Sequence, residues 1–107
     1  MTGLTNKKVL TKLKKLKSRL NNQFKIQKFM LFGSRARDDW LLNSDVNIIL
    51  ISSDFKKLKF KERSAEVIGH WDGPIDLEPL CYTPEEFKRK SMEIGIVRQA
   101  IKEGINI

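Results

Sequence analysis

The sequence contains only one cysteine, and none of its apolar runs approaches the length of a membrane span. A single cysteine in 107 residues excludes an internal disulfide framework. Cys81 lies in an apolar, strand-like segment, so we expect a buried and unreactive thiol. No charged-then-apolar leader opens the chain, which predicts a cytoplasmic protein that does not enter a membrane. Repeats, linkers and low-complexity tracts are also missing, so we expect one domain over residues 1–107.

Acidic residues are absent from the first 28 positions, which carry nine lysines and arginines. The other 12 of the 21 basic residues accompany all 13 acidic ones, so the net charge of +8 comes from the N-terminal segment. Such a segment favours an anionic partner, either nucleic acid or an acidic protein face. The alternative is a solvated, lysine-rich helix face, and we favour it because such faces are common on helices without such a partner.

Hydrophobic periodicity predicts alternating helices and strands around a small sheet. Apolar residues at three- and four-residue steps predict a helix over 5–22, and apolar, β-branched or turn-bounded runs predict three strands, over 24–32, 45–51 and 75–82. A short helix is expected through Arg35, Ala36 and Trp40, and a second over 55–71 with Ser53 or Asp54 as its cap. A third is expected to run from Thr83 toward Lys102, with a break near Gly95 and its end at Gly104. In the last of these, Thr83, Pro84 and Glu86 form a capping box with proline at the first helical position. The fold class is therefore α/β (α+β), a sheet of three or more strands with helices packed against it.

Four oxygen-bearing side chains fall at two-residue spacing on two of the predicted strands. Asp45 and Asn47 project to one side of their strand, and Asp76 and Glu78 to one side of theirs. If the strands are neighbours, one sheet face carries a cluster of ligands suited to a hard cation such as Mg²⁺. Alternatively, Asp45 only caps the end of a strand.

Gly33 and Ser34 separate an apolar strand from the next predicted helix. A glycine lets a phosphate approach the backbone, and the N–H groups that open a helix attract it. A phosphate cradle beside a metal cluster indicates phosphoryl or nucleotidyl transfer, although the dipeptide could also be an ordinary turn.

The segments Leu31–Arg37 and Ser44–Leu50 resemble the signature of minimal nucleotidyltransferases of the DNA polymerase beta superfamily. The family pattern is Gly-Ser, ten residues, then Asp-any-Asp, and here residues 35–44 separate Ser34 from Asp45. A third family carboxylate is matched by Asp76 in the stretch 74–77, and the stretch 82–87 resembles the start of the family's next helix.

The resemblance implies a nucleotidyltransferase fold, a nucleoside triphosphate (ATP is the expected one) and a two-metal Mg²⁺ site. It also implies a frequent partner, a HEPN-domain protein, in toxin–antitoxin pairs. By the same match Gly33, Ser34 and Arg37 would bind the triphosphate. Asp45 and Asp76 would be catalytic, and both would ligate metal together with Asn47. For Arg35 and Arg37 a solvent-exposed helix face is the alternative to phosphate contact.

Two positions depart from the family pattern. The second motif carboxylate is Asn47, which keeps a neutral oxygen but loses the charge. Asp38 stands where the family has glycine, and it places an acid near the cradle. Glu78, Asp38 or Asp39 could compensate for the missing charge. We expect His70 to lie at a helix end or on the surface. We expect Trp40 and Trp71 to pack against other residues rather than stack on a base.

The first functional hypothesis is therefore an enzyme that moves a nucleoside monophosphate from Mg-NTP to an unknown acceptor, weakened or inactivated by Asn47. The second is a catalytically degraded binding module, or an antitoxin-like partner of a HEPN-domain protein. The third is nucleic-acid binding through the basic first helix, which a steep salt dependence of affinity would reveal.

Overall fold

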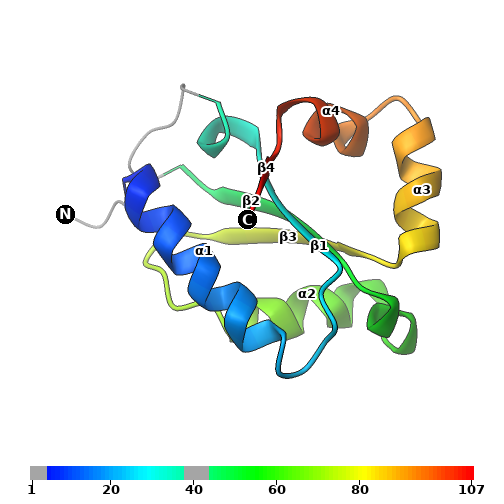
Figure 1. Ribbon diagram of the computed structural model, residues 1–107, viewed down its shortest axis with the longest axis horizontal. Coiled ribbons are helices and arrows are strands. Elements are labelled where there is room, and N and C mark those ends of the chain that lie inside the picture. Colours follow the sequence, from blue (N-terminus) through cyan, green and yellow to red (C-terminus); the bar gives the residue numbers. More distant parts are fainter. Residues whose placement is uncertain (1–4, 38–43) are drawn as a thin grey trace.

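A four-stranded mixed sheet forms the centre of the computed structural model, which describes residues 5–37 and 44–107 (Figure 1). Its strands are β1 (Lys28–Phe32), β2 (Val46–Ile51), β3 (Leu77–Tyr82) and β4 (Ile105–Asn106), in the spatial order β3-β2-β1-β4. Strand β1 runs antiparallel to both β2 and β4, whereas β2 and β3 are parallel. The expected mixed α/β class, with three or more strands, is confirmed.

Helices α1 (Asn6–Leu20) and α2 (Phe60–Gly69) cover one face of the sheet (Figure 1). The apolar side of α1 is buried as its periodicity predicts, and α2 contributes Val67 to the same core. The strands supply every second residue to it, for example Val46, Ile48 and Leu50 of β2. This alternation assigns the intervening residues of each strand to the opposite face.

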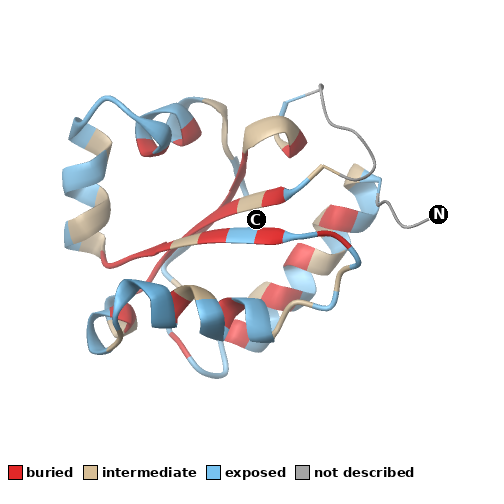
Figure 2. Cartoon of the chain, turned by 180° about the vertical axis from the view of Figure 1, so that it is seen from behind, coloured by how far each residue is buried: buried red, intermediate tan, exposed pale blue. Residues whose placement is uncertain are grey.

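The opposite face is covered only in part, by α3 (Pro84–Met92) and α4 (Ile96–Glu103). Val97 and Ala100 of α4 pack there against a second core that includes Ile49 and Ile51 of β2. Figure 2 shows the buried strands running between these two layers of helices. The N-terminal part of this face, near the starts of β2 and β3, carries the half-buried Asn47 and the exposed Glu78.

The capping box predicted for α3 is present in full. The Thr83 hydroxyl accepts from the Glu86 backbone N–H at 3.2 Å, and the Glu86 carboxylate accepts from the Thr83 backbone N–H at 2.8 Å. The expected break before α4 is also confirmed, because Gly95 is its N-terminal boundary residue and Gly104 its C-terminal one.

The extents of two predicted elements and the position of one predicted cap were wrong. The strand expected over 24–32 begins only at Lys28, because Phe24 turns inward and packs against Phe55 with ring centroids 5.0 Å apart. The helix expected over 55–71 is two helices, η2 (Ser53–Lys57) and α2, and Ser52 rather than Ser53 or Asp54 caps the first. Half-buried Leu58 has extended backbone angles and lies against the core, which interrupts the helix between them.

The fourth strand was missed by the sequence reading. Two residues, Ile105 and Asn106, pair with Leu31 and Met30 of β1, and both are exposed. A two-residue exposed segment has no alternating apolar pattern, so only the pairing reveals it. None of the helices formed by residues 5–37 and 44–107 has the length and apolarity needed to cross a bilayer.

Candidate functional site

Gly33 follows β1 directly and bends the chain away from the sheet. Its φ angle of +77° lies in the left-handed region, and no other glycine in the described ranges lies in that region. A β-carbon added here would come within 2.9 Å of the Asn47 side-chain nitrogen. Position 33 is therefore glycine for two independent reasons, the backbone angle and the close approach of Asn47.

Replacement of Gly33 by alanine is expected to lower the free energy of unfolding by more than about 1 kcal/mol, because the native φ strains any L side chain. Urea unfolding of Gly33→Ala would measure the loss. Gly69→Ala is the matched control, since a β-carbon at Gly69, in α2, meets no atom within 4 Å. Equal stability of the two variants would contradict this role for Gly33.

The parallel register of β2 and β3 brings the sequence-predicted carboxylates into one region. Val46 pairs with Leu77 and Asn47 with Glu78, so Asp45 and Asp76 precede the two strands side by side. The Val46 backbone N–H donates to the Asp76 carbonyl at 2.9 Å, which ties the segment before β3 to the start of β2. Neighbouring strands lie roughly 5 Å apart. Both carboxylates are exposed and thus open to a ligand.

Asn47 lies between the glycine bend and these carboxylates. It pairs with Phe32 of β1 on one side and with Glu78 of β3 on the other. Strand alternation places Asn47 and Glu78 on the partly covered face of the sheet. The structure therefore gathers Gly33, Asp45, Asn47, Asp76 and Glu78 at the ends of three adjacent strands.

The donor set suits a hard divalent cation whose coordination is completed by ligand oxygens and water. Asp45 and Asp76 offer carboxylates, and Asn47 offers one neutral oxygen. Within residues 5–37 and 44–107, no three Asp, Glu, His or Cys side chains form a group that could hold a metal.

Within the described residues, the helix expected through Arg35 and Ala36 is a single 3₁₀ turn, η1 (Gly33–Arg35), and its expected continuation to Trp40 lies outside them. Ala36 and Arg37 both donate their backbone N–H to the Gly33 carbonyl. Half-buried Ser34 makes no side-chain hydrogen bond with any described residue, so its hydroxyl is available. Asp38, Asp39 and Trp40 lie outside the described residues.

The two arginines of this segment differ in environment. Arg35 is 1% exposed, so the alternative of a solvent-exposed helix face was wrong for this residue. Its guanidinium donates to the Ser44 carbonyl at 3.0 and 3.2 Å, and it exchanges hydrogen bonds with Asn6 of α1. It thus joins η1, α1 and the approach to β2, and burial lowers its pKa. Arg37 is exposed and pairs with Glu103 of α4 at 2.9 Å.

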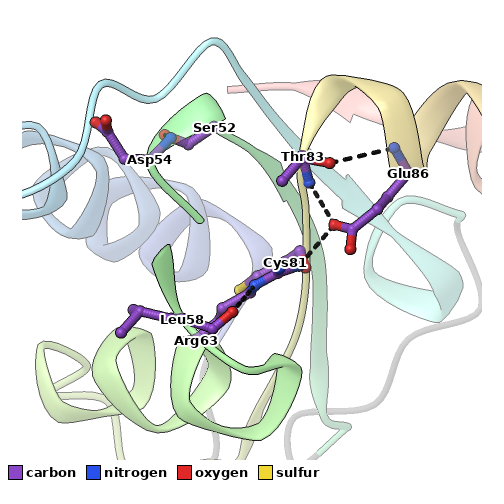
Figure 3. A network of polar contacts seen from close by, with 7 residues as sticks. All are labelled: Ser52, Asp54, Leu58, Arg63, Cys81, Thr83 and Glu86. Carbon is purple, nitrogen blue, oxygen red and sulfur yellow. Dashed lines mark hydrogen bonds and ion pairs between the residues drawn. The ribbon is translucent and has the colours of Figure 1, made fainter. Parts of the chain in front are cut away.

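A buried arginine that the sequence reading missed anchors β3 to α2 and α3 (Figure 3). Arg63 is 6% exposed and donates to the Leu58 carbonyl at 3.0 Å, the Cys81 carbonyl at 3.2 Å and the Glu86 carboxylate at 2.6 Å. Burial alone would raise the pKa of Glu86, but the hydrogen bonds from Arg63 and Thr83 outweigh it and hold that pKa below its usual value. Arg63 falls on a charged helix stretch, and nothing in the sequence separates it from its exposed neighbours.

The structure agrees with the expectations for Cys81, His70 and Trp71. Cys81 is buried, and burial raises the pKa of its thiol to about 12, which leaves it protonated and unreactive. His70 caps the C-terminus of α2 and contacts Gln23. Trp71 is half-buried against the core formed by α1 and α2, and its indole N–H donates to the Ile75 carbonyl at 2.9 Å.

Some of the N-terminal cations have partners within the protein. Lys12 and Arg19 both pair with Asp72, at 3.5 and 3.3 Å, and Lys17 donates to the Ile107 carbonyl at 2.7 Å. Lys14 and Lys15 stay exposed on α1. The basic helix is therefore partly neutralised by the domain itself, and nucleic-acid binding through it remains a prediction.

Comparison with known proteins agrees with this geometry. A solved structure of a Sulfolobus solfataricus protein, described provisionally as a nucleotidyltransferase, superposes with a TM-score of 0.69. The match covers 94% of this chain and 80% of that one at 20% identity, so it shows a shared fold. Comparison with curated protein sequences gave no match. The family model described as "Polymerase beta, Nucleotidyltransferase" matches residues 14–107. The chain therefore belongs to the polymerase beta nucleotidyltransferase family.

Proposed function

We propose that this protein is a minimal nucleotidyltransferase that transfers a nucleoside monophosphate from Mg-NTP, with ATP as the expected donor, to a hydroxyl acceptor. The observation that carries the proposal is the β2–β3 register, which sets Asp45 beside Asp76. Gly33, in the left-handed region, lies against Asn47 next to them. Family membership supports the same reading.

In this proposal the triphosphate lies over the bend at Gly33. The absent side chain lets the phosphates approach, and the available Ser34 hydroxyl donates to one of them. Arg37 contributes positive charge after leaving Glu103. Mg²⁺, when bound by Asp45, Asn47 and Asp76, would neutralise phosphate charge and lower the pKa of the attacking hydroxyl.

The transfer itself is an in-line displacement. The acceptor oxygen forms a bond to the α-phosphorus while the bond from that phosphorus to the bridging oxygen breaks, and pyrophosphate leaves. Asp76 receives the hydroxyl proton in this proposal, because it lies at the start of the terminal strand β3, where an acceptor has access.

The test is Mg-ATP binding by calorimetry, combined with transfer of label from α-labelled ATP into a cell extract. Asp45→Ala and Asp76→Ala should each abolish transfer and weaken metal-dependent ATP binding, because each removes a metal ligand. Glu62→Ala, which removes an exposed carboxylate of α2, should leave both unchanged. The absence of metal-dependent ATP binding by the unaltered chain would overturn the proposal.

One observation favours a second function. Asn47 supplies no charge where the family pattern has an aspartate. A degraded site of this kind fits a binding module, or an antitoxin-like partner of a HEPN-domain protein. Stable binding of such a partner that survives Asp45→Ala and Asp76→Ala, without any label transfer, would favour this second function.

A further inference from the structure

A cavity of about 380 Å³ opens beside the candidate catalytic carboxylates, at the outer edge of β3. Its volume lies within the range of small-molecule sites. The residues that line it include Ile68, Trp71, Gly73, Pro74, Asp76 and Glu78.

The apolar wall of the cavity is held rigidly. The indole N–H of Trp71 donates to the Ile75 carbonyl at 2.9 Å, which fixes the ring. A β-carbon at Gly73 would lie 2.4 Å from the Trp71 ring, so only glycine allows the ring to rest against this turn. The adjoining Asp76 is tied to β2 through its carbonyl. The wall and the backbone that carries Asp76 are thus positioned before any ligand arrives.

The sheet order separates the two sides of the candidate site. Gly33 and Ser34 follow β1, Asp45 and Asn47 lie at the start of β2, and the cavity borders β3, the terminal strand on the far side. A donor triphosphate over Gly33 therefore leaves the β3 side for the second substrate. We propose that the cavity bounded by Trp71, Ile68, Asp76 and Glu78 binds the acceptor, and that this acceptor is a hydroxyl compound with an apolar body and no negative charge.

The lining of the cavity determines that chemical class. Ile68, Trp71 and Pro74 provide an apolar surface, and the two charged groups, Asp76 and Glu78, are both carboxylates. Among residues 5–37 and 44–107, no lysine or arginine lines the cavity to neutralise a phosphate or a carboxylate of the acceptor. An anionic acceptor, including a nucleic-acid backbone, would meet like charge there, whereas a neutral or cationic one would not.

The inference rests on the proposed nucleotidyl transfer, in which the acceptor hydroxyl loses its proton to Asp76 and bonds to the α-phosphorus as pyrophosphate leaves. Asp76 and Trp71 both line this cavity, so in this proposal a hydroxyl bound there is placed within reach of the Asp76 carboxylate. Glu78 acts here as a positioning residue that selects charge on the acceptor.

The test uses three phenols that share a ring and a hydroxyl but differ in charge: tyramine, 4-ethylphenol and 4-hydroxyphenylacetate. Ligand-observed NMR on the full chain should give the affinity order tyramine, then 4-ethylphenol, then 4-hydroxyphenylacetate. Ile68→Ser should weaken tyramine binding roughly fivefold by removing apolar contact. The control is Ile101→Ser on α4, because Ile68 and Ile101 are 46% and 45% exposed and only Ile68 lines the cavity. Glu78→Gln should reduce the preference for tyramine over 4-ethylphenol.

Several outcomes would overturn the assignment. They are equal loss of binding in Ile68→Ser and Ile101→Ser, binding of 4-hydroxyphenylacetate as tight as that of tyramine, and no phenol binding at all. Calorimetry with Mg-ATP on the same samples separates the two proposals. If Mg-ATP binds and no phenol does, the acceptor site is wrong and the proposed transfer stands. If Mg-ATP does not bind, the transfer fails and the acceptor assignment with it.

Discussion

Asn47→Asp is expected to raise the nucleotide-transfer rate by roughly 10²-fold or more and to tighten Mg²⁺ binding, since removal of one preorganised charged group from such a site costs about that much. Asn47 occupies the β2 position between Gly33 and the carboxylates, where its neutral oxygen carries no charge toward a cation. Aspartate has nearly the same shape, so the close approach of Gly33 to position 47 survives the change.

The measurement compares the two chains in Mg²⁺ titrations with ATP and in transfer of label from α-labelled ATP. Asn22→Asp, which adds the same charge at an exposed position after α1, is the control and should change neither quantity. If Asn47→Asp alters nothing while the protein stays folded, two explanations remain. Either Glu78 already supplies the charge, or the chain is not an enzyme. If Glu78→Gln abolishes residual transfer, Glu78 supplies the charge. If the unaltered chain transfers no label at all, the chain is not an enzyme.

Arg63→Ala is expected to lower the free energy of unfolding by about 2–3 kcal/mol, because it leaves a charged group and two carbonyls without their donor. The lost partners are the Glu86 carboxylate and the carbonyls of Leu58 and Cys81 (Figure 3). Because the Glu86 side chain is 31% exposed, water can solvate its carboxylate once Arg63 is removed. The expected loss of stability is therefore smaller than for a fully buried ion pair.

Urea unfolding monitored by circular dichroism would measure this change. Arg98→Ala is the matched control: this arginine is exposed on α4 and makes no ion pair with any residue in the described ranges, so its removal should cost little. Arg63→Met would keep the aliphatic packing while removing the donors, and it should recover only part of the stability lost in Arg63→Ala. If Arg63→Ala were as stable as Arg98→Ala, the network would contribute nothing.

The sequence by itself determined the elements whose signals are local. The apolar steps of α1 are a helical period, and Thr83, Pro84 and Glu86 form a capping box because each bond spans only three residues. The spacing from Gly33-Ser34 to Asp45 and on to Asp76 pointed to the family that the comparisons then showed. Two-residue alternation also paired Asp76 with Glu78, and both line one cavity.

Only the tertiary structure decided what depends on contacts between distant segments. Arg35 and Arg63 look like surface charges in sequence, yet both are buried because carbonyls and side chains from other elements surround them. The break between η2 and α2 follows from Leu58 packing into the core, which no local propensity encodes. Strand β4 exists only through its pairing with β1. The cavity beside Asp76 likewise required Trp71 and Gly73 to meet across a turn. Hydrogen-bond satisfaction and close packing are properties of the assembled chain, so such features are fixed only when the segments come together.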